Sequence, residues 1–145
     1  MKKIITTIVI AVATVFAFAK TADEKAIEAN IQAQSITISQ DMVVPNNYGE
    51  LFLTEEMGDF NVFLLKKIKE LLCEKEPSCR VMTTAEVGTI NVKGTSATAE
   101  VFLKTRCTPK RVEFQDNDVR CIMTFKKVNG QWKMAENKVK DVKYL

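Results

Sequence analysis

The chain has 145 residues, with 21 basic and 18 acidic side chains and a formal net charge of +3. Without residues 1–19, which carry two lysines, the balance falls to (21 − 2) − 18 = +1, and this argues against nucleic acid or an anionic membrane as the partner. The chain has no histidine, so Ser-His-Asp triads, Cys-His pairs and H-E-x-x-H zinc sites are excluded. We expect no cofactor and no metal.

Residues 1–19 have the three parts of a secretory signal peptide. Lys2 and Lys3 form a positively charged n-region, an apolar run follows, and Ala17-Phe18-Ala19 is an A-x-A cleavage site. The apolar run is shorter than the roughly 20 residues of a spanning helix, although an uncleaved anchor is the alternative. We therefore predict a single domain over residues 20–145 that is periplasmic or secreted and makes no membrane contact after cleavage.

The first half of this domain has helical patterns. Thr21 and Glu24 form a capping box that predicts a helix start, and Thr54 predicts another. A loop is expected between them, at residues 45–49, and Gly58 is expected to interrupt the second helix. An apolar stripe follows, which we predict to pack on a sheet as its core face: Phe60, Phe63, Leu64, Ile68, Leu71 and Leu72.

The second half alternates with a period of two residues, which is typical of strands. The alternation predicts four strands at residues 86–92, 95–107, 119–128 and 131–139. Lys93-Gly94 and Asn129-Gly130 suit two-residue hairpin turns, and Asn-Gly favours a type I′ turn. The predicted architecture is α+β, with N-terminal helices packed on a curved four-stranded antiparallel meander.

Cysteines in an exported chain are expected to pair. A register that places Cys107 opposite Cys121 also collects the apolar residues of both strands on one face, so it predicts a Cys107–Cys121 disulfide. Cys73 and Cys79 enclose a short loop after the second helix and form the other predicted pair.

The predicted registers define an inward face that is a candidate pocket. Glu86, Lys127 and Glu136 fall on this face, where they would line the mouth of a pocket or be solvated at strand ends. The alternative for the whole face is a filled core. Its apolar members are Val101, Leu103, Met123, Phe125, Trp132 and Met134.

Two segments carry a family resemblance. The hairpin from Ile90 to Val101 and the closing N-G-x-W-K strand, within Phe125 to Met134, resemble the sheet of nuclear-transport-factor-2-like proteins, in particular their small exported bacterial lumazine-binding-domain-like branch. The resemblance implies a cone-like fold, often with an apolar pocket.

No catalytic constellation is visible in the sequence. We therefore expect an exported, disulfide-stapled, non-enzymatic module that binds a small apolar ligand or a protein partner, with a homodimer through the sheet as one arrangement. One alternative is a small isomerase or hydrolase that uses Glu86 or Glu136 together with Lys127 or a tyrosine. The other is a toxin, immunity or secretion-apparatus component.

Overall fold

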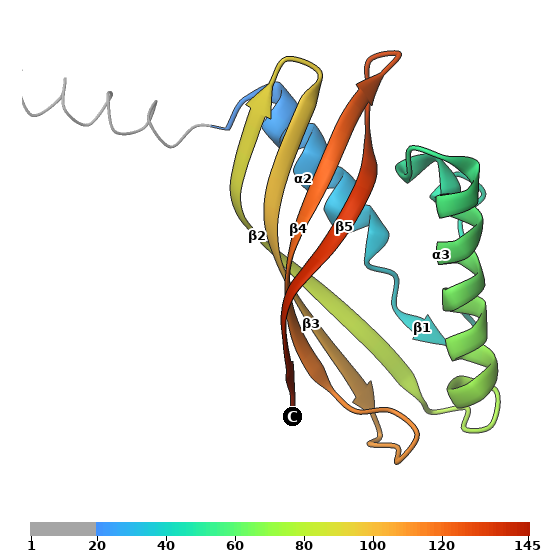
Figure 1. The fold of residues 1–145 in the computed structure, drawn as a ribbon. Helices are drawn as coiled ribbons and strands as arrows, with labels where there is room; N and C mark the ends of the chain where they lie inside the picture. The colour runs from blue at the N-terminus through green and yellow to red at the C-terminus, as the bar shows by residue number, and fades with distance from the viewer. Residues whose placement is uncertain (1–19) are drawn as a thin grey trace, which may run out of the picture.

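The computed structural model describes residues 20–145. The predicted signal peptide and its cleavage site lie outside the described residues, so the division at residue 19 stays a prediction. The predicted α+β class is confirmed (Figure 1). The elements are α2 (Ala22–Gln34), β1 (Ile38–Ser39), the 3-10 helix η1 (Tyr48–Leu51), α3 (Glu55–Ile68) with the π-helical turn η2 (Lys69–Cys73), β2 (Arg80–Lys93), β3 (Ser96–Thr108), β4 (Asn117–Val128) and β5 (Gln131–Tyr144).

The strands form one antiparallel sheet in the order β1-β2-β3-β4-β5. The predicted count of four is wrong because the short strand β1 pairs with the start of β2, Ile38 opposite Val81. The register shifts once between β2 and β3 and twice between β4 and β5. Such bulges increase the local twist, and the sheet curls so that α2 lies against its concave face while α3 stands at one side (Figure 1).

The hairpin between β4 and β5 has the predicted register. Phe125 lies opposite Met134 and Lys127 opposite Trp132. Asn129 and Gly130 have φ angles of 51° and 78°, the positive values that the predicted type I′ turn requires.

The other two predicted registers are wrong. Cys121 lies opposite Val101 instead of Cys107, so β3 and β4 are offset by six residues from the prediction. A shift by an even number of residues leaves each side chain on its face, which is why the predicted inward face of these two strands is still correct. In the β2–β3 hairpin the turn is one residue later than predicted, and Ile90 lies opposite Ala99.

The concave face of the sheet is filled by α2 and η1. Ile27 and Ile31 of α2, together with Tyr48 and Phe52, are buried against the inward residues of the strands. These strand residues are Ala97, Ala99, Val101, Cys121, Met123, Phe125, Trp132 and Met134.

The prediction that the α3 stripe is a core face holds only at its C-terminal end, where Leu72 is buried beside Val81 and Ile68 packs on the same cluster. The rest of the stripe is exposed. Phe60 is 59 % exposed and Phe63 is 57 % exposed. The helix packs on the domain through another face, where Gly58 lies against Gly49: a Cβ atom added to Gly58 would lie 2.9 Å from the Gly49 carbonyl oxygen. Gly58 therefore does not interrupt α3, since it provides the close approach that fixes the helix.

Both predicted helix starts are confirmed. The backbone N–H of Glu24 donates to the Thr21 hydroxyl at 3.1 Å, and the N–H of Met57 donates to the Thr54 hydroxyl at 3.2 Å. These caps satisfy amide donors that the first turn of a helix leaves free.

Candidate functional site

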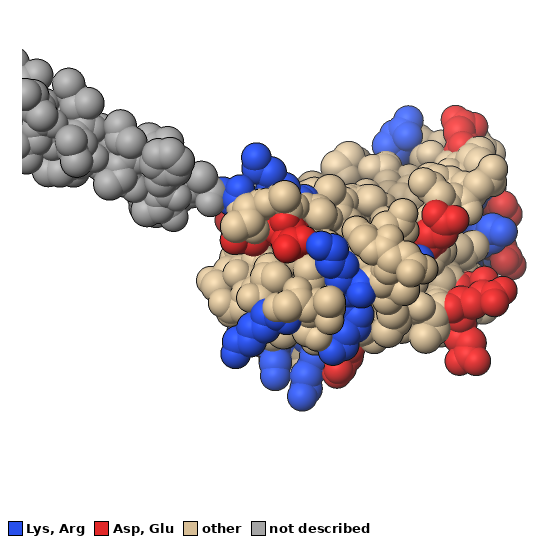
Figure 2. Space-filling view, turned by 90° about the horizontal axis from the view of Figure 1, so that it is seen from above, with Lys and Arg blue, Asp and Glu red and all other residues tan. Residues whose placement is uncertain are grey.

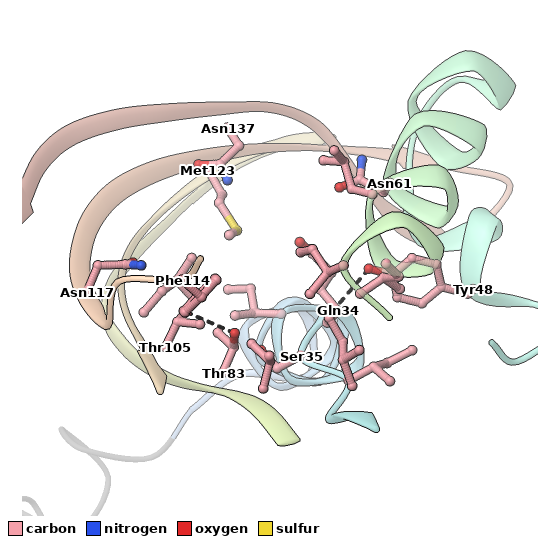
Figure 3. A pocket seen from close by; sticks show the side chains of 18 residues that line it. Gln34, Ser35, Tyr48, Asn61, Thr83, Thr105, Phe114, Asn117, Met123 and Asn137 are labelled. Carbon is pink, nitrogen blue, oxygen red and sulfur yellow. Dashed lines mark hydrogen bonds between the residues drawn. The ribbon is translucent and has the colours of Figure 1, made fainter. Parts of the chain in front are cut away.

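A groove of about 350 Å³ lies between α3, the end of α2 and the concave face of the sheet (Figure 3). We call it the α3–sheet groove. Among the residues that the structure describes, no charged side chain lines it. Its apolar walls are Ile31, Ile36, Ile38, Leu64, Leu65, Ile68, Val81, Leu103, Phe114 and Met123, and its polar residues are Gln34, Ser35, Tyr48, Asn61, Thr83, Thr105, Asn117 and Asn137.

Hydrogen bonds hold several of the polar groups in place. The Asn61 amide donates to the Met57 carbonyl at 2.8 Å, and the Asn117 amide donates to the Gln115 carbonyl at 3.1 Å. Each amide oxygen can accept further hydrogen bonds. Thr83 and Thr105 share a hydroxyl–hydroxyl bond of 2.9 Å across β2 and β3.

The groove offers neutral hydrogen-bonding groups rather than acid–base chemistry. Its one titratable lining residue is Tyr48, and burial raises the pKa of the Tyr48 phenol above its ordinary value of 10.0. The Tyr48 hydroxyl donates to the Gln34 carbonyl at 3.2 Å. Such a surface can recognise a neutral partner by hydrogen bonds and apolar contact.

The predicted apolar pocket residues divide into two groups. Leu103 and Met123 line the α3–sheet groove. The other four lie in the core, where Val101 and Phe125 have no exposed surface and Trp132 and Met134 are also buried.

Glu86 and Glu136 lie away from the groove. Glu86 is exposed opposite Phe102, whereas its neighbours Ala85 and Val87 pack on the core. Glu136 is exposed opposite Thr124. Register shifts between Val87 and Ile90 and at Ala135 put both carboxylates on the outer face of the sheet. The enzymatic alternative therefore lacks the pocket carboxylate that it requires.

Lys127 takes part in a contact at the start of α2. Its ammonium group lies 3.1 Å from an Asp23 oxygen and 5.8 Å from the centre of the Trp132 ring, and the Trp132 indole N–H donates to Asp23 at 2.9 Å. The hydrogen bond from Trp132, and then that from Lys127, lowers the pKa of Asp23. This contact joins α2 to the β4–β5 hairpin.

The four cysteines are buried free thiols, so both predicted disulfides are wrong. Cys79 and Cys107 lie with their sulfur atoms 3.8 Å apart, and the Cys73 thiol donates to the Ile38 carbonyl at 3.7 Å. Cys121 lies apart, with its thiol 3.6 Å from the Val101 carbonyl. The offset of six residues between β3 and β4 separates Cys107 from Cys121.

The buried thiols predict a loss of stability at alkaline pH. Burial, and then a hydrogen bond with Cys79, raises the pKa of Cys73 to about 12 and that of Cys107 to about 11, from an ordinary value of 9.0. The unfolded chain therefore releases these protons at lower pH than the folded chain. Their contribution to stability is complete below pH 9 and declines as the pH rises through 11 to 12.

We expect the urea midpoint to fall as the pH is raised above about 9. In Cys107→Ala the fall should be shallower, because one of the shifted groups is gone. A midpoint that stays constant or rises over this range in the natural sequence would contradict the prediction.

One family model matches part of the chain. The region that matches spans residues 80–145, which contain β2, β3, β4 and β5. The matching family model is described as the C-terminal domain of the anti-sigma-I factor RsgI9. Neither the search of curated proteins nor the search of solved structures found a match.

This similarity corrects two predictions. The family found is that of an anti-sigma factor domain and not the nuclear-transport-factor-2-like superfamily that the strand motifs suggested. The prediction of a disulfide-stapled ligand-binding module is wrong, because the matching model is that of an anti-sigma factor domain and the four cysteines are free. A protein partner is compatible with the similarity, whereas a small apolar ligand is not. No helix in residues 20–145 is both long and apolar enough to cross a membrane.

The sequence did not reveal the polar residues of the groove. Asn61, Asn117 and Asn137 belong to no motif, and their residue types are common on surfaces. One signal was present: Asn137 lies opposite Met123, so it is a polar residue at an inward position of its strand. Finding it required the correct β4–β5 register.

Proposed function

We propose that this chain is a regulatory domain that acts by binding a segment of a partner protein in the α3–sheet groove. The observation that carries the proposal is the combination of apolar walls with neutral amide and hydroxyl groups. An extended polypeptide presents the matching chemistry, because its backbone carries neutral donors and acceptors and its side chains can fill apolar pockets.

The similarity to an anti-sigma-I factor domain supports a regulatory role and gives the first partner class to test, a sigma factor. The location of the domain is a separate proposal, which rests on the sequence of residues 1–19 and places it outside the cytoplasm. Direct contact with a sigma factor requires that both proteins share a compartment. Outside the cytoplasm the groove would instead take a segment of another protein of the regulatory system.

Two neighbouring residues of β5 provide a matched test. Asn137 lies opposite Met123 and lines the groove, whereas Lys138 lies opposite Ile122 and is not among the lining residues. Both are exposed, so tryptophan at either position should leave the fold intact. A photo-crosslinking amino acid at position 137 would identify the partner in the native host, and titration calorimetry would then measure its affinity.

We expect Asn137→Trp to weaken binding of the identified partner by about tenfold or more, because the new side chain occupies the groove. Lys138→Trp should leave the affinity within about twofold. Equal affinities for the two variants, or equal crosslinking from positions 137 and 138, would overturn the proposal that the groove is the binding site.

A further inference from the structure

The exposed face of α3 carries a seam of four residues. Glu56, Phe60, Phe63 and Lys67 follow one another at intervals of four, three and four residues, which places them on one side of a helix. All four are exposed, and the two phenylalanines have more than half of their surface free. Large aromatic side chains that are adjacent and exposed are typical of an interaction surface.

The seam residues do not pack on the core of their own domain. Gly58 lies against Gly49, and Val62 and Leu65 pack on the buried cluster, so the opposite side of α3 faces inward. In Figure 1 the helix forms one outer edge of the molecule. None of the four seam residues lines the groove, which α3 lines with Asn61, Leu64, Leu65 and Ile68.

The order of residue types in the seam is self-complementary. When two copies of α3 are placed antiparallel around the midpoint of the seam, Phe60 of one copy meets Phe63 of the other. The same alignment places Glu56 opposite Lys67, and the two-fold symmetry repeats both contacts. A parallel alignment would instead bring Glu56 against Glu56 and Lys67 against Lys67.

We propose that the occupant of this face is a second copy of the same chain, joined through an antiparallel α3–α3 contact. The proposal does not rest on the binding of a partner in the α3–sheet groove. It also differs from the dimer through the sheet that the sequence suggested, since no strand takes part.

The charges along α3 favour the antiparallel arrangement over its whole length. Glu55 and Glu56 lie in the first turn, and Lys66 and Lys67 lie in the last. Figure 2 shows acidic side chains gathered on the side of the molecule where α3 begins. Lys67 lies 3.6 Å from Glu70 of its own helix, and both side chains are about half exposed. Such an exposed pair is weak and leaves Lys67 able to contact a second copy.

Charge exchange tests the contact without altering the core. We expect sedimentation equilibrium of the full chain to show a dimer for the natural sequence. Glu56→Lys and Lys67→Glu should each raise the dimer dissociation constant by about tenfold at low salt, because each places like charges together at two symmetric positions. The double variant Glu56→Lys/Lys67→Glu should recover to within about threefold of the natural value.

Phe63→Ser tests the apolar part of the seam and should raise the dissociation constant by about 30-fold or more. Circular dichroism would establish that each variant is folded. A natural chain that is monomeric at all concentrations would overturn the proposal. So would a dimer that Phe63→Ser leaves intact, or a double variant no stronger than the single ones. None of these outcomes alters the expected effect of Asn137→Trp on the groove.

Discussion

Met134→Ala is expected to lower the free energy of unfolding by about 2–5 kcal/mol. Met134 is 4 % exposed and lies opposite Phe125, in the cluster that α2 and η1 close from the concave side. Truncation removes the packed thioether chain and leaves a cavity that α2 and the sheet can fill only in part. The measurement is urea unfolding followed by circular dichroism.

Met82→Ala is the matched control for this prediction. Met82 lies on β2, and 47 % of its surface is exposed. The same truncation at this position should change stability by less than about 0.5 kcal/mol. If both variants lost the same amount, the assignment of Met134 to the filled core would be incorrect.

Asn30→Asp is expected to be the most damaging conservative change in α2. The Asn30 amide group donates to the Leu51 and Trp132 carbonyls, each at 3.0 Å, and its oxygen accepts from Gln34 at 2.8 Å. A carboxylate has nearly the same shape as the amide, but it cannot donate either hydrogen bond. It also places a negative charge against the two carbonyl oxygens. Loss of one buried and one partly buried hydrogen bond predicts a cost of about 2–6 kcal/mol, at about 1–3 kcal/mol for each unsatisfied group.

The control for this change is Asn91→Asp, at an exposed position of β2. We expect this variant to unfold within about 0.5 kcal/mol of the natural chain. Comparable losses in the two aspartate variants would show that Asn30 does not join α2, η1 and β5 in the way the hydrogen bonds indicate.

Helix caps and the Asn-Gly turn could be predicted from local sequence, whereas the registers of the β2–β3 and β3–β4 pairs could not. The Asn129-Gly130 turn set the β4–β5 pairing correctly from the turn to the Phe125–Met134 pair, because only two residues separate the strands there. A longer connection, over residues 109–116, joins β3 to β4, and it fixes no register. The β3–β4 register was therefore predicted by placing Cys107 opposite Cys121, and this register was wrong by six residues.

The face of the sheet on which each strand residue lies was predicted more reliably than the residue or element that it contacts. Val101, Met123, Phe125 and Met134 are inward-facing, as the alternation indicated. Glu86 was placed on the wrong face because the bulge in β2 gives no clear signal in a period-two pattern. The α3 stripe was misplaced for another reason, since apolar periodicity shows that a helix has an apolar face but not which partner covers it.

The groove itself was not predictable as a set of residues. Its lining comes from α2, α3 and several strands, and these elements meet only when the tertiary structure forms. Its polar members have no shared spacing that a sequence pattern could report.

The hydrogen bond between Asn30 and the Trp132 carbonyl joins residues that are 102 positions apart. During synthesis the first helix of the domain therefore leaves the ribosome long before the strand that receives it. Ile27 and Ile31, which are buried in the folded domain, have no β4–β5 hairpin to pack on until β5 has been made. A ribosome stalled before β5 would thus hold a domain that cannot complete its core, and the domain reaches its stable form only after β5 is released.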